Sequence, residues 1–565
     1  MAAVEFLAAC VGHRGPRLRV VFATGYLHRV RLYRGHEGAS VPHELAVEPI
    51  IGLEVHVQLA TRTKLWCGCP LEFGAPPNSR VCPVCLGLPG ALPVLNRQAV
   101  EFAILTGLAL NCRVSDFTKW DRKSYFYPDL PKNYQISQYD LPLCADGHFE
   151  FPFDQRYGKV RIRRAHLEED AGKNLHDIAD CTCVDLNRAG TPLLEIVTEP
   201  DLRSAEEARE FAVQLQRLVR YLGVSEANMQ KGQMRFEPNI NLRITRDGQE
   251  LHTPIVEVKN LNSFRSLHLA IAFEVGRQLE EWRQTGRIAQ PGNKTNRGWD
   301  DVREVTTPQR EKEEAHDYRY FPDPDLVPYR PDPARVRELR EHMPELPIAR
   351  TERFISEYKL PPRDAPALVD CRSSADLLDR AAELGGDKLT LGKQFLSFWA
   401  KHANERQTTI AGLGLPAHRL TALANLVHAG RVNATAAAQI ADAVVRKADE
   451  LIAQRTDARR PEPWECRKPF APVDSPEMDP ALLAERLGLL QSRDEGQMAA
   501  WVAQALAANP KAVQDALGNP KKLAAARGFL TGQVMKLSGG KADPKVVGGL
   551  IEQKLAEVDR RGTEA

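Results

Sequence analysis

The chain lacks a long hydrophobic run: none of its 565 residues belong to a stretch of about 18 or more uncharged apolar residues. This predicts a soluble protein without a membrane span. An excess of charge of one sign is also missing, since 76 Lys and Arg stand against 74 Asp and Glu. With no overall positive field, any contact with nucleic acid must come from a local basic surface.

Cysteine is sparse, with 11 residues in the whole chain. Secreted disulfide scaffolds are far denser in cysteine, so we expect a reducing compartment. A bacterial cytoplasm is preferred, and the interior of a mitochondrion or plastid is the alternative. Walker-type glycine loops and dinucleotide fingerprints are absent as well. If ATP binds, it must bind through a less common framework.

The chain divides into four segments by composition. Residues 1–47 are an Arg-rich N-terminal extension, either an organelle-targeting presequence or an ordinary bacterial extension. Residues 48–295 mix alternating apolar runs with Gly, Pro and Asn turns, which predicts an α+β fold with a largely antiparallel central sheet. Residues 296–412 predict a connector with a helical domain, and residues 413–565 an all-helical tail.

One helix of the second segment is marked at both ends. Ser204 and Glu207 have the spacing of a capping box, apolar positions recur through Tyr221, and Gly223 can end the helix. We expect this helix to be structural.

Four cysteines form two close pairs, Cys67 with Cys69 and Cys82 with Cys85. Paired thiolates brought together by a loop suit tetrahedral zinc, and four protein ligands leave no open position for catalysis. The spacing therefore predicts a structural zinc site, with four reduced structural cysteines as the alternative.

Polar residues alternate with apolar ones along residues 51–59, which places Glu54, His56 and Gln58 on one face of a strand. Similar reasoning applies to Glu195 in residues 193–199, while three acidic residues follow His166 closely at positions 168–170. Each pattern alone is typical of a solvated face or an ion pair. Together they could supply oxygen ligands for magnesium.

A further alternating run, residues 235–243, carries Arg, Glu and Asn on one face, and Glu257 and Lys259 repeat the pattern nearby. Such faces suit a triphosphate or an anionic transition state, although Pro238 argues against a regular central strand. Residues 119–139 interleave basic and aromatic side chains, which indicates either a surface for unpaired nucleotides or a buried aromatic turn.

These segments together resemble closely the B subunit of the tRNA-dependent aspartyl/glutamyl amidotransferase. The resemblance extends from about residue 49 to the C-terminus and is densest before residue 330. It is carried by IGLEVHVQL (51–59), FGAPPN (73–78), CPVCLGLPG (82–90), RKSYFYPDLPKNYQISQYD (122–140), HLEEDAGK (166–173), DLNRAGTPLLEIVTEPD (185–201), KNLNSFR (259–265) and DYRYFP (317–322).

The resemblance implies a cradle-shaped catalytic domain, a helical domain and a tail that engages tRNA. It implies that ATP phosphorylates the side-chain carboxylate of Glu-tRNA(Gln) and/or Asp-tRNA(Asn), and that ammonia then displaces phosphate. Activation is needed because a carboxylate is a poor electrophile, and cations must offset the repulsion between two anions. We find no amidase or glutaminase signature in the chain, so a separate amidase subunit and a small clamp subunit are expected partners, whereas DNA and membranes are not.

Mapped onto this chain, the resemblance implies three sets of site residues. The expected catalytic and magnesium-binding residues are Glu54, His56, Glu169 and Glu195. The expected contacts to ATP phosphates or the substrate carboxylate are Arg122, Lys123, Lys173, Arg188, Arg235 and Lys259. The expected zinc ligands are Cys67, Cys69, Cys82 and Cys85, and the tyrosines expected to shape the acceptor-end pocket are Tyr125, Tyr127 and Tyr134.

Departures from the family pattern occur at Gln233, where a Ser is usual, and at Glu237, where an Asp is usual. The longer carboxylate changes its reach, which puts a ligand role at Glu237 in doubt. Two alternatives remain: a zinc-stabilised protein that presents tRNA without catalysis, and a stand-alone kinase or ligase. Intact Glu54, Glu169 and Glu195 argue against the first, and the missing phosphate loop argues against the second.

Overall fold

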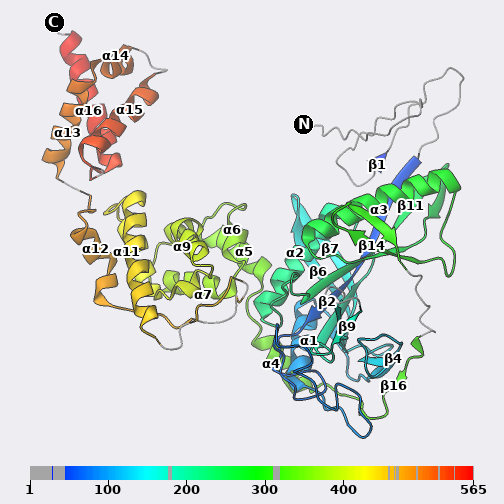
Figure 1. Cartoon of the computed structure of the whole chain (residues 1–565). Coiled ribbons are helices and arrows are strands. Elements are labelled where there is room, and N and C mark those ends of the chain that lie inside the picture. Colours follow the sequence, from blue (N-terminus) through cyan, green and yellow to red (C-terminus); the bar gives the residue numbers. More distant parts are fainter. Residues whose placement is uncertain are drawn as a thin grey trace, which may run out of the picture. The chain divides into compact units, whose positions relative to one another are not determined.

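The structure is a computed structural model of the whole chain (Figure 1). It describes residues 28–29, 45–175, 181–309, 318–455, 459–463, 465, 470–491, 494–518, 522–539 and 541–563. Most of the expected N-terminal extension, residues 1–27 and 30–44, lies outside the described residues. Among the helices that are described, none has both the length and the apolar character needed to cross a bilayer.

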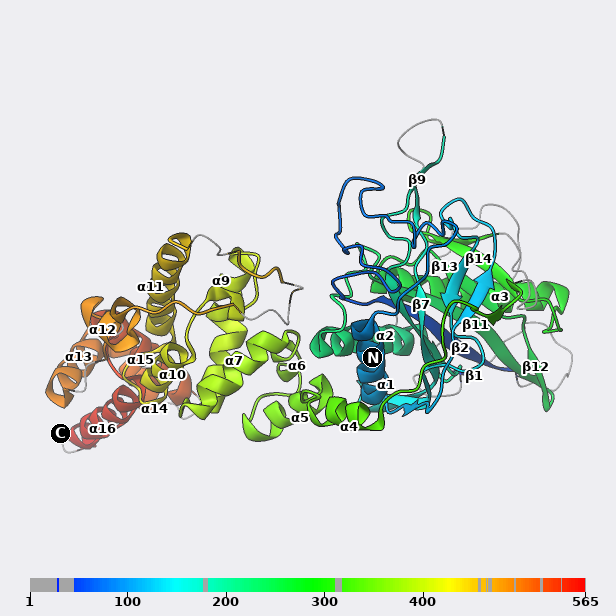
Figure 2. The ribbon, with the colours of Figure 1, turned by 90° about the horizontal axis from the view of Figure 1, so that it is seen from below.

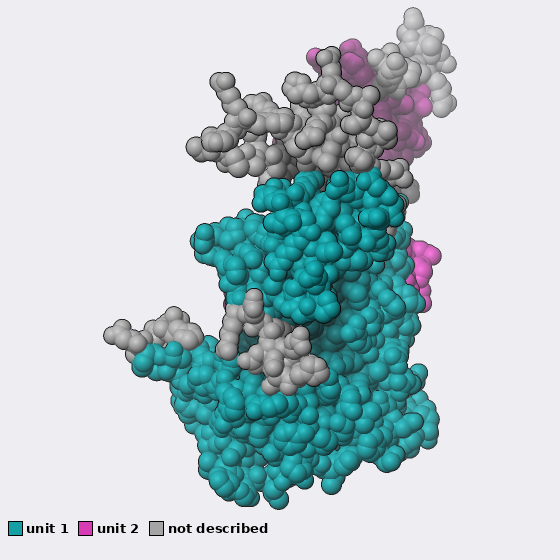
Figure 3. Space-filling view, turned by 90° about the vertical axis from the view of Figure 1, so that its right-hand side faces the viewer, with its two compact units in different colours: residues 1–344 teal, residues 345–565 magenta. Residues whose placement is uncertain are grey.

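The chain forms two compact units, residues 1–344 and residues 345–565, which are coloured separately in Figure 3. Unit 1 contains the strands and the sequence-predicted site residues. Unit 2 is helical throughout its described part.

Unit 1 is built on an eleven-stranded sheet, so the expected α+β class is confirmed. Its strand order is β15-β14-β13-β11-β2-β10-β7-β6-β3, with β1 beside β2 and β12 beside β11. The strands of this sheet are β1 (His28–Arg29), β2 (Leu45–Gln58), β3 (Arg113–Val114), β6 (Cys144–Phe153), β7 (Arg156–Glu169), β10 (Pro192–Thr198), β11 (Met234–Arg246), β12 (Gln249–His252), β13 (Val256–Lys259), β14 (Thr295–Asp300) and β15 (Val305–Pro308).

The sheet is antiparallel except at one pair, β13 and β14, which run parallel. These strands are joined by α3 (Phe264–Thr285), because two parallel neighbours need a crossover and a helix supplies it. Pro238 lies within β11 and pairs with Leu53 of β2. The strand therefore continues through the proline. On the other side of β11, the pairing with β13 includes only Asn239 and Ile240, so it does not need an N–H from Pro238.

One face of the sheet is apolar and is covered by α1 (Arg97–Ala109), α2 (Ala205–Leu222) and α3 (Figures 1 and 2). Phe236 of β11 packs against Phe264 of α3 with ring centroids 5.9 Å apart. Phe149 of β6 meets Phe211 of α2 at 5.9 Å. Because successive strand residues point to opposite faces, the polar residues between these apolar ones are left on the other face.

The helix predicted from residue 204 is α2, and its caps are as expected. The Ser204 hydroxyl accepts a hydrogen bond from the Glu207 N–H at 3.1 Å, and Gly223 ends the helix in the left-handed conformation with φ 71°. The Glu207 carboxylate accepts from the N–H of Arg203, one residue before the usual partner in a capping box.

Smaller elements surround the polar face. A three-stranded sheet joins β4 (Asp121–Ser124), β5 (Tyr134–Ser137) and β16 (Phe321–Pro322). A hairpin pairs β8 (Lys173–Leu175) with β9 (Cys183–Asp185). The segment that holds the two cysteine pairs, residues 67–85, is a series of loops.

Helices follow from α4 onward. Those before α13 are α4 (Pro333–Glu341), α5 (Pro347–Glu357), α6 (Ala365–Leu368), α7 (Arg372–Glu383), α8 (Lys388–Gln394), a π-helical turn (Phe395–Trp399), α9 (Ala400–Glu405), α10 (Ala417–His428), α11 (Ala434–Ala453) and α12 (Pro480–Arg486), with short 3₁₀ turns at Ala411–Leu413 and Pro476–Met478. The last three of these α-helices, α10 to α12, belong to the expected tail, residues 413–565. Gly385, with φ 88°, separates α7 from α8.

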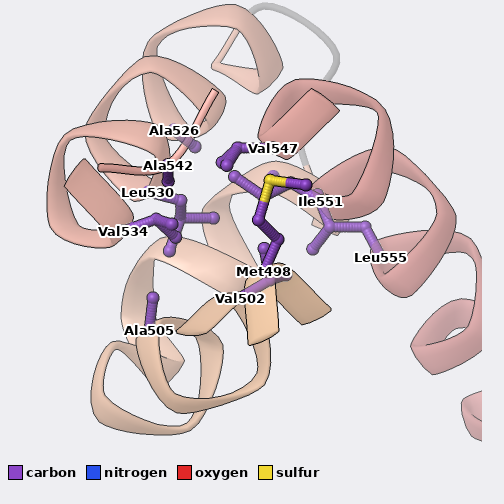
Figure 4. Packing of buried hydrophobic residues seen from close by; sticks show 11 residues of the cluster. Met498, Val502, Ala505, Ala526, Leu530, Val534, Ala542, Val547, Ile551 and Leu555 are labelled. Carbon is purple, nitrogen blue, oxygen red and sulfur yellow. The ribbon is translucent and has the colours of Figure 1, made fainter. Parts of the chain in front are cut away.

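The C-terminal part of the tail comprises α13 (Glu495–Ala508), α14 (Pro510–Gly518), α15 (Leu523–Leu537) and α16 (Pro544–Thr563). Its own buried core includes Met498, Leu530, Val534 and Ile551, whose side chains converge in Figure 4. The expected helical tail is therefore observed.

Candidate functional site

The polar face of the sheet is centred on β2. Glu54, His56 and Gln58 alternate there with buried Val55 and Val57, as the sequence pattern predicted. On the neighbouring strands, Glu195 of β10 and Arg235 of β11 lie directly opposite His56. Cross-strand neighbours on one face are about 5 Å apart, so His56 has Glu195 on one side and Arg235 on the other.

A β-bulge sets which residues of β7 reach this face. Val197 of β10 pairs with Arg164, but Thr198 pairs with Ile162, so Arg163 is an extra residue. Bulges of this kind re-aim side chains and are common beside active sites. The shift brings Arg164, His166 and Glu168 to the polar face and leaves Ile162 and Val160 in the core.

His56, Glu168 and Glu195 form the central cluster, in which one potential ligand atom from each residue lies within 4.8 Å of the others. His56 Nε2 is 3.5 Å from Glu195 Oε2 and 3.8 Å from Glu168 Oε1. His166 Nε2 is 3.6 Å from the same Glu195 oxygen. The cluster is buried, which strengthens every electrostatic interaction within it.

Burial lowers the pKa of His56, but the hydrogen bond to Glu195 and the charges of Glu195, Glu237 and Glu168 outweigh it and raise the pKa to about 9. Burial dominates at His166, whose pKa falls to about 4. Burial raises the pKa of Glu168, whereas the two histidines hold that of Glu195 well below its usual value.

Lys123 of β4 faces this cluster. Its ammonium lies 5.3 Å from the centre of the Tyr318 ring. Burial lowers its pKa, but the charges of Glu168 and Glu195 keep the pKa well above the usual value. A charged lysine therefore stands near two carboxylates, and no direct ion pair between them is found among the described residues.

A second acidic cluster lies two residues along β2 and consists of Glu54, Glu237 and Glu257. Lys259 Nζ is 2.7 Å from Glu237 and 3.1 Å from Glu257, and Lys294 is 3.0 Å from Glu257. Two ammonium groups thus offset three carboxylates. Glu237, whose ligand role the departure from the family pattern had put in doubt, reaches the cluster with its longer side chain.

At the other end of the polar face, three side chains surround the carboxylate of Asp170. Gln58 Nε2 donates to it at 2.7 Å and Arg235 donates at 2.8 Å, while Arg188 Nε lies 3.6 Å away. The charge of Arg235 helps to lower the pKa of Asp170 against the effect of burial. The side chains of Arg188 and Arg235 remain about one-third exposed, so an anion can reach them.

Three predicted site residues lie elsewhere. Glu169 points to the opposite side of β7, where Lys132 Nζ and the N–H of Ile136 donate to its carboxylate. Arg122 is held by Asp323 at 2.7 Å. Lys173 is exposed on the β8–β9 hairpin.

Sequence reasoning selected Glu169 where the structure brings Glu168 to the cluster. The sequence contained the information needed to choose Glu168. Residues two apart in a strand lie on the same face, so Glu168 lies on the face of His166 and Glu169 lies on the opposite one. Glu257 was noted as part of an alternating pair but was not chosen as a metal ligand. Its position beside Glu54 depends on pairing between β11 and β13, which the local pattern does not reveal.

The four cysteines of the loop segment converge as their spacing predicted, with Sγ atoms within 4.8 Å of one another. A hydrogen bond from Cys67 and another from the Cys82 N–H lower the pKa of Cys85 to about 4, against the effect of burial. Lys64 Nζ adds a contact of 3.5 Å to Cys85 Sγ. The pKa values of Cys67 and Cys69 are raised instead, through a hydrogen bond to Cys85 at Cys67 and burial at Cys69. The convergence of four sulfur donors fits zinc.

Aromatic rings line the small sheet beside the central cluster. Tyr139 stacks on Tyr320 with centroids 4.3 Å apart and an interplanar angle of 13°. Contacts of about 6 Å then link Tyr320 to Tyr318, Tyr318 to Tyr125, and Tyr125 to Tyr127. Of the predicted pocket tyrosines, Tyr125 and Tyr127 belong to this row, whereas Tyr134 lies under the Arg122 guanidinium at 4.3 Å.

Comparison with known proteins gives the family. Residues 49–337 match the GatB/GatE catalytic domain and residues 470–555 match the GatB domain. The B subunit of the aspartyl/glutamyl-tRNA(Asn/Gln) amidotransferase from Rhodopirellula baltica is 44% identical over 519 residues, which are 91% of this chain and 97% of the relative.

Proteins of the same name from two other bacteria agree. The one from Thermomicrobium roseum is 44% identical over 518 residues, and the one from Carboxydothermus hydrogenoformans is 41% identical over 515 residues. Each alignment spans 90% of this chain and 99% of the relative. The chain therefore belongs to the family of aspartyl/glutamyl-tRNA(Asn/Gln) amidotransferase B subunits.

Proposed function

We propose that this chain activates the side-chain carboxylate of Glu-tRNA(Gln) and/or Asp-tRNA(Asn). A carboxylate oxygen attacks the γ-phosphorus of ATP, ADP leaves, and an acyl phosphate forms. Ammonia then attacks the acyl carbon, and phosphate leaves together with a proton from the nitrogen. The products are Gln-tRNA(Gln) and/or Asn-tRNA(Asn), ADP and phosphate.

The observation that carries this proposal is the polar face of the sheet, where a buried histidine and two carboxylates meet beside the ammonium of Lys123, which has no ion pair among the described residues. Phosphoryl transfer between two anions depends on positioning and on positive charge around the transferred group. Acidic and basic groups held side by side can bind a cation and phosphates together.

Magnesium is the proposed cation. Its ligands would be His56, Glu168 and Glu195, and a second cation would be held by Glu54 with Glu237 and Glu257. Carboxylate oxygens suit magnesium, and the remaining coordination positions suit water and phosphate. A bound cation would supply positive charge to the phosphate oxygens. The imidazole is the less usual donor, and its Nδ1 is buried without a partner in the described structure.

The residues proposed to contact phosphate or the substrate carboxylate are Lys123, Arg188, Arg235 and Lys259, all of which border the polar face. For Arg122 and Lys173, a contact to phosphate or to the substrate carboxylate is proposed from the sequence resemblance alone. The ion pair of Arg122 with Asp323 and the exposed position of Lys173 favour peripheral roles for both. Glu169 is proposed to position Lys132 and β5 rather than to bind magnesium.

The four-cysteine cluster is proposed to hold structural zinc. Partners of the chain are proposed to be an amidase subunit, which makes ammonia, and a small clamp subunit, together forming a heterotrimer. The helical tail within residues 413–565 is proposed to engage tRNA, and a bacterial cytoplasm is the proposed location.

The test is phosphate release from the γ-position of ATP by the assembled heterotrimer, with Glu-tRNA(Gln) and added ammonium. Wild type should form Gln-tRNA, and Glu195→Gln should lose at least about a hundredfold of the rate because it removes a charged ligand of the proposed magnesium ion. Binding of tRNA should be unchanged. If Glu195→Gln releases phosphate at the wild-type rate, or if wild type consumes no ATP, the alternative of a protein that only presents tRNA takes its place.

A further inference from the structure

Lys64 is a buried lysine to which the proposed function gives no role, and it is 0% exposed. Its Nζ donates to Cys85 Sγ at 3.5 Å and to the carbonyl oxygen of Leu186 at 3.4 Å. Among the described residues, this ammonium forms no ion pair with a carboxylate. A buried charge is costly unless it is paired, so the sulfur of Cys85 is the counter-ion of Lys64.

Lys64 contacts both cysteine pairs of the four-cysteine cluster. Its backbone N–H donates to the carbonyl oxygen of Cys69 at 3.0 Å, and its side chain reaches Cys85. Hydrogen bonds to the ligands of a metal orient these ligands, and their loss commonly lowers metal affinity by about 10- to 100-fold. Lys64 therefore has the position of a residue that supports the proposed zinc site without binding the metal itself.

The second acceptor of Lys64 belongs to the turn that carries Arg188. The Leu186 carbonyl, at the start of this turn, accepts from Lys64 Nζ. At the end of the turn, the carbonyl of Gly190 accepts from the N–H of Leu65 at 2.9 Å. Two consecutive residues, 64 and 65, thus hold both ends of the turn.

The turn also packs closely against the lysine and the cysteine. Gly190 has φ 84°, and a Cβ added there would lie 3.5 Å from Lys64 Cδ and 3.7 Å from Cys85 Cβ. Closely packed groups of this kind transmit displacements to one another. A movement of Cys85 therefore reaches the turn through Lys64.

The guanidinium of Arg188 depends on the position of this turn. Its Nε donates to the carbonyl oxygen of Ala171 at 2.9 Å and lies 3.6 Å from Asp170 Oδ2, at the edge of the polar face. Small misplacements of a group that binds substrate are costly. A loosened turn would therefore weaken the contact that Arg188 is proposed to make with phosphate.

We propose that Lys64 is a positioning residue that couples the four-cysteine cluster to Arg188. With the metal bound, the sulfur of Cys85 holds the ammonium of Lys64, and the ammonium holds the turn. Without the metal, Lys64 loses a fixed partner and the turn loosens, so loss of the metal weakens binding of ATP. This inference rests on the proposed function, which assigns phosphate to Arg188 and zinc to the cysteines.

The first measurement is the zinc affinity of the assembled heterotrimer, by competition with a chelator. Lys64→Met removes the ammonium but keeps an unbranched stem, and it should lower the zinc affinity by about tenfold or more. Lys231→Met is the matched control, because Lys231 Nζ lies 5.2 Å from the centre of the Phe73 ring, in the same loop segment. This control should keep the zinc affinity of wild type, and an unchanged zinc affinity in Lys64→Met would overturn the proposal.

The second measurement is binding of β,γ-imido-ATP, an analogue that retains its γ-phosphate, in the presence of magnesium and saturating zinc. Lys64→Met should weaken this binding about fivefold in a chain that has Arg188. In the Arg188→Ala background it should have no further effect, because the lysine acts through that arginine. In steady-state kinetics, Lys64→Met should raise the KM for ATP several-fold while kcat stays within about twofold.

The third measurement repeats the binding of the analogue after the chelator has removed zinc. Wild type should bind the analogue more weakly than before, whereas the affinities of Lys64→Met and Arg188→Ala should change little. The comparison of wild type with Arg188→Ala tests the coupling even if Lys64→Met does not fold.

Equal weakening by Lys64→Met with and without Arg188 would assign the lysine to general packing and overturn the proposal. Zinc-free wild type with full affinity for the analogue would overturn it as well. If zinc-loaded wild type does not bind the analogue, the proposed function itself fails. If wild type binds it and Lys64→Met binds it equally well, that function stands and only the coupling is rejected.

Discussion

Glu168 and Glu169 are neighbours in the sequence but act on opposite sides of β7. Glu168 lies with His56 and Glu195, whereas Glu169 binds Lys132 and the N–H of Ile136. Because successive residues of a strand point to opposite faces, one of these carboxylates lies at the proposed cation site and the next pairs with a buried lysine.

This contrast predicts different consequences for two similar substitutions. Glu168→Gln should weaken binding of the proposed Mg²⁺ by about tenfold or more and change stability little, because it removes one of the carboxylates proposed as its ligands. Glu169→Gln should leave Mg²⁺ binding near wild type and lower the free energy of unfolding by about 2–4 kcal/mol, because it leaves Lys132 without its charged partner. Calorimetric titration and urea unfolding measure the two effects. The reverse pattern would return Glu169 to the proposed cation site.

Asp379 of unit 2 provides a prediction about pH. Burial raises its pKa, but hydrogen bonds from Arg353, Tyr358 and Arg350 outweigh this and lower the pKa below its usual value. A lowered pKa stabilises the folded state above the unfolded pKa of about 4, and the stabilisation is lost as pH falls through the folded pKa. Asp379→Asn should therefore cost about 2–3 kcal/mol at pH 7, and this difference should shrink below about pH 4.

Denaturant unfolding of wild type and variant at several pH values measures this difference. Asp376→Asn is the matched control, because Asp376 binds the same Arg350 at 2.7 Å with a side chain that is 53% exposed. Its cost should be smaller. A cost for Asp379→Asn that does not change with pH would contradict the assigned cause.

Among the elements, the loop between the cysteine pairs is tied to the site through Asn78. Its N–H donates to Asp185 Oδ1 at 3.1 Å, its Nδ2 donates to the Val184 carbonyl at 2.9 Å, and its Oδ1 accepts from the Leu186 N–H at 2.8 Å. These bonds hold the turn that leads directly to Arg188. The loop thus positions one of the cations of the polar face.

We expect Asn78→Ala to raise the KM for ATP several-fold while kcat stays within about twofold, because Arg188 binds less precisely without its turn. Zinc content should be unchanged. Asn111→Ala is a suitable control, since Asn111 has a similar φ, 55° against 58°, and its side chain donates to the His148 carbonyl at 3.2 Å, away from Arg188. Steady-state kinetics and metal analysis of both variants test this prediction. Equal effects of the two substitutions on the KM for ATP would contradict a role of Asn78 in positioning Arg188.

For the whole molecule, the two units have separate cores, so we expect them to unfold separately. The cysteine cluster lies in unit 1, residues 1–344. Removal of the proposed zinc by a chelator should therefore lower the unfolding temperature of one transition and leave that of the other, from residues 345–565, unchanged. Differential scanning calorimetry measures both. One merged transition, or a shift of both by the chelator, would contradict this independence.

Local patterns were sufficient for much of this molecule. The alternation around His56 predicted its strand, the capping box predicted α2, and the spacing of four cysteines predicted their convergence. Each of these features depends on residues that are close in sequence, and the periods of strands and helices translate sequence directly into shared faces. The resemblance carried by longer segments predicted the family, which the comparisons confirmed.

The composition of the site was decided by the tertiary structure. The bulge at Arg163 determines that Arg164 reaches the polar face, and the pairing of β11 with β13 brings Glu257 to Glu54. Neither event has a local signal, because strand register and bulges depend on partners far away in the sequence. The sequence by itself determined the family, the fold class and most of the side chains involved; only the folded sheet decided that Glu168, not Glu169, stands beside His56.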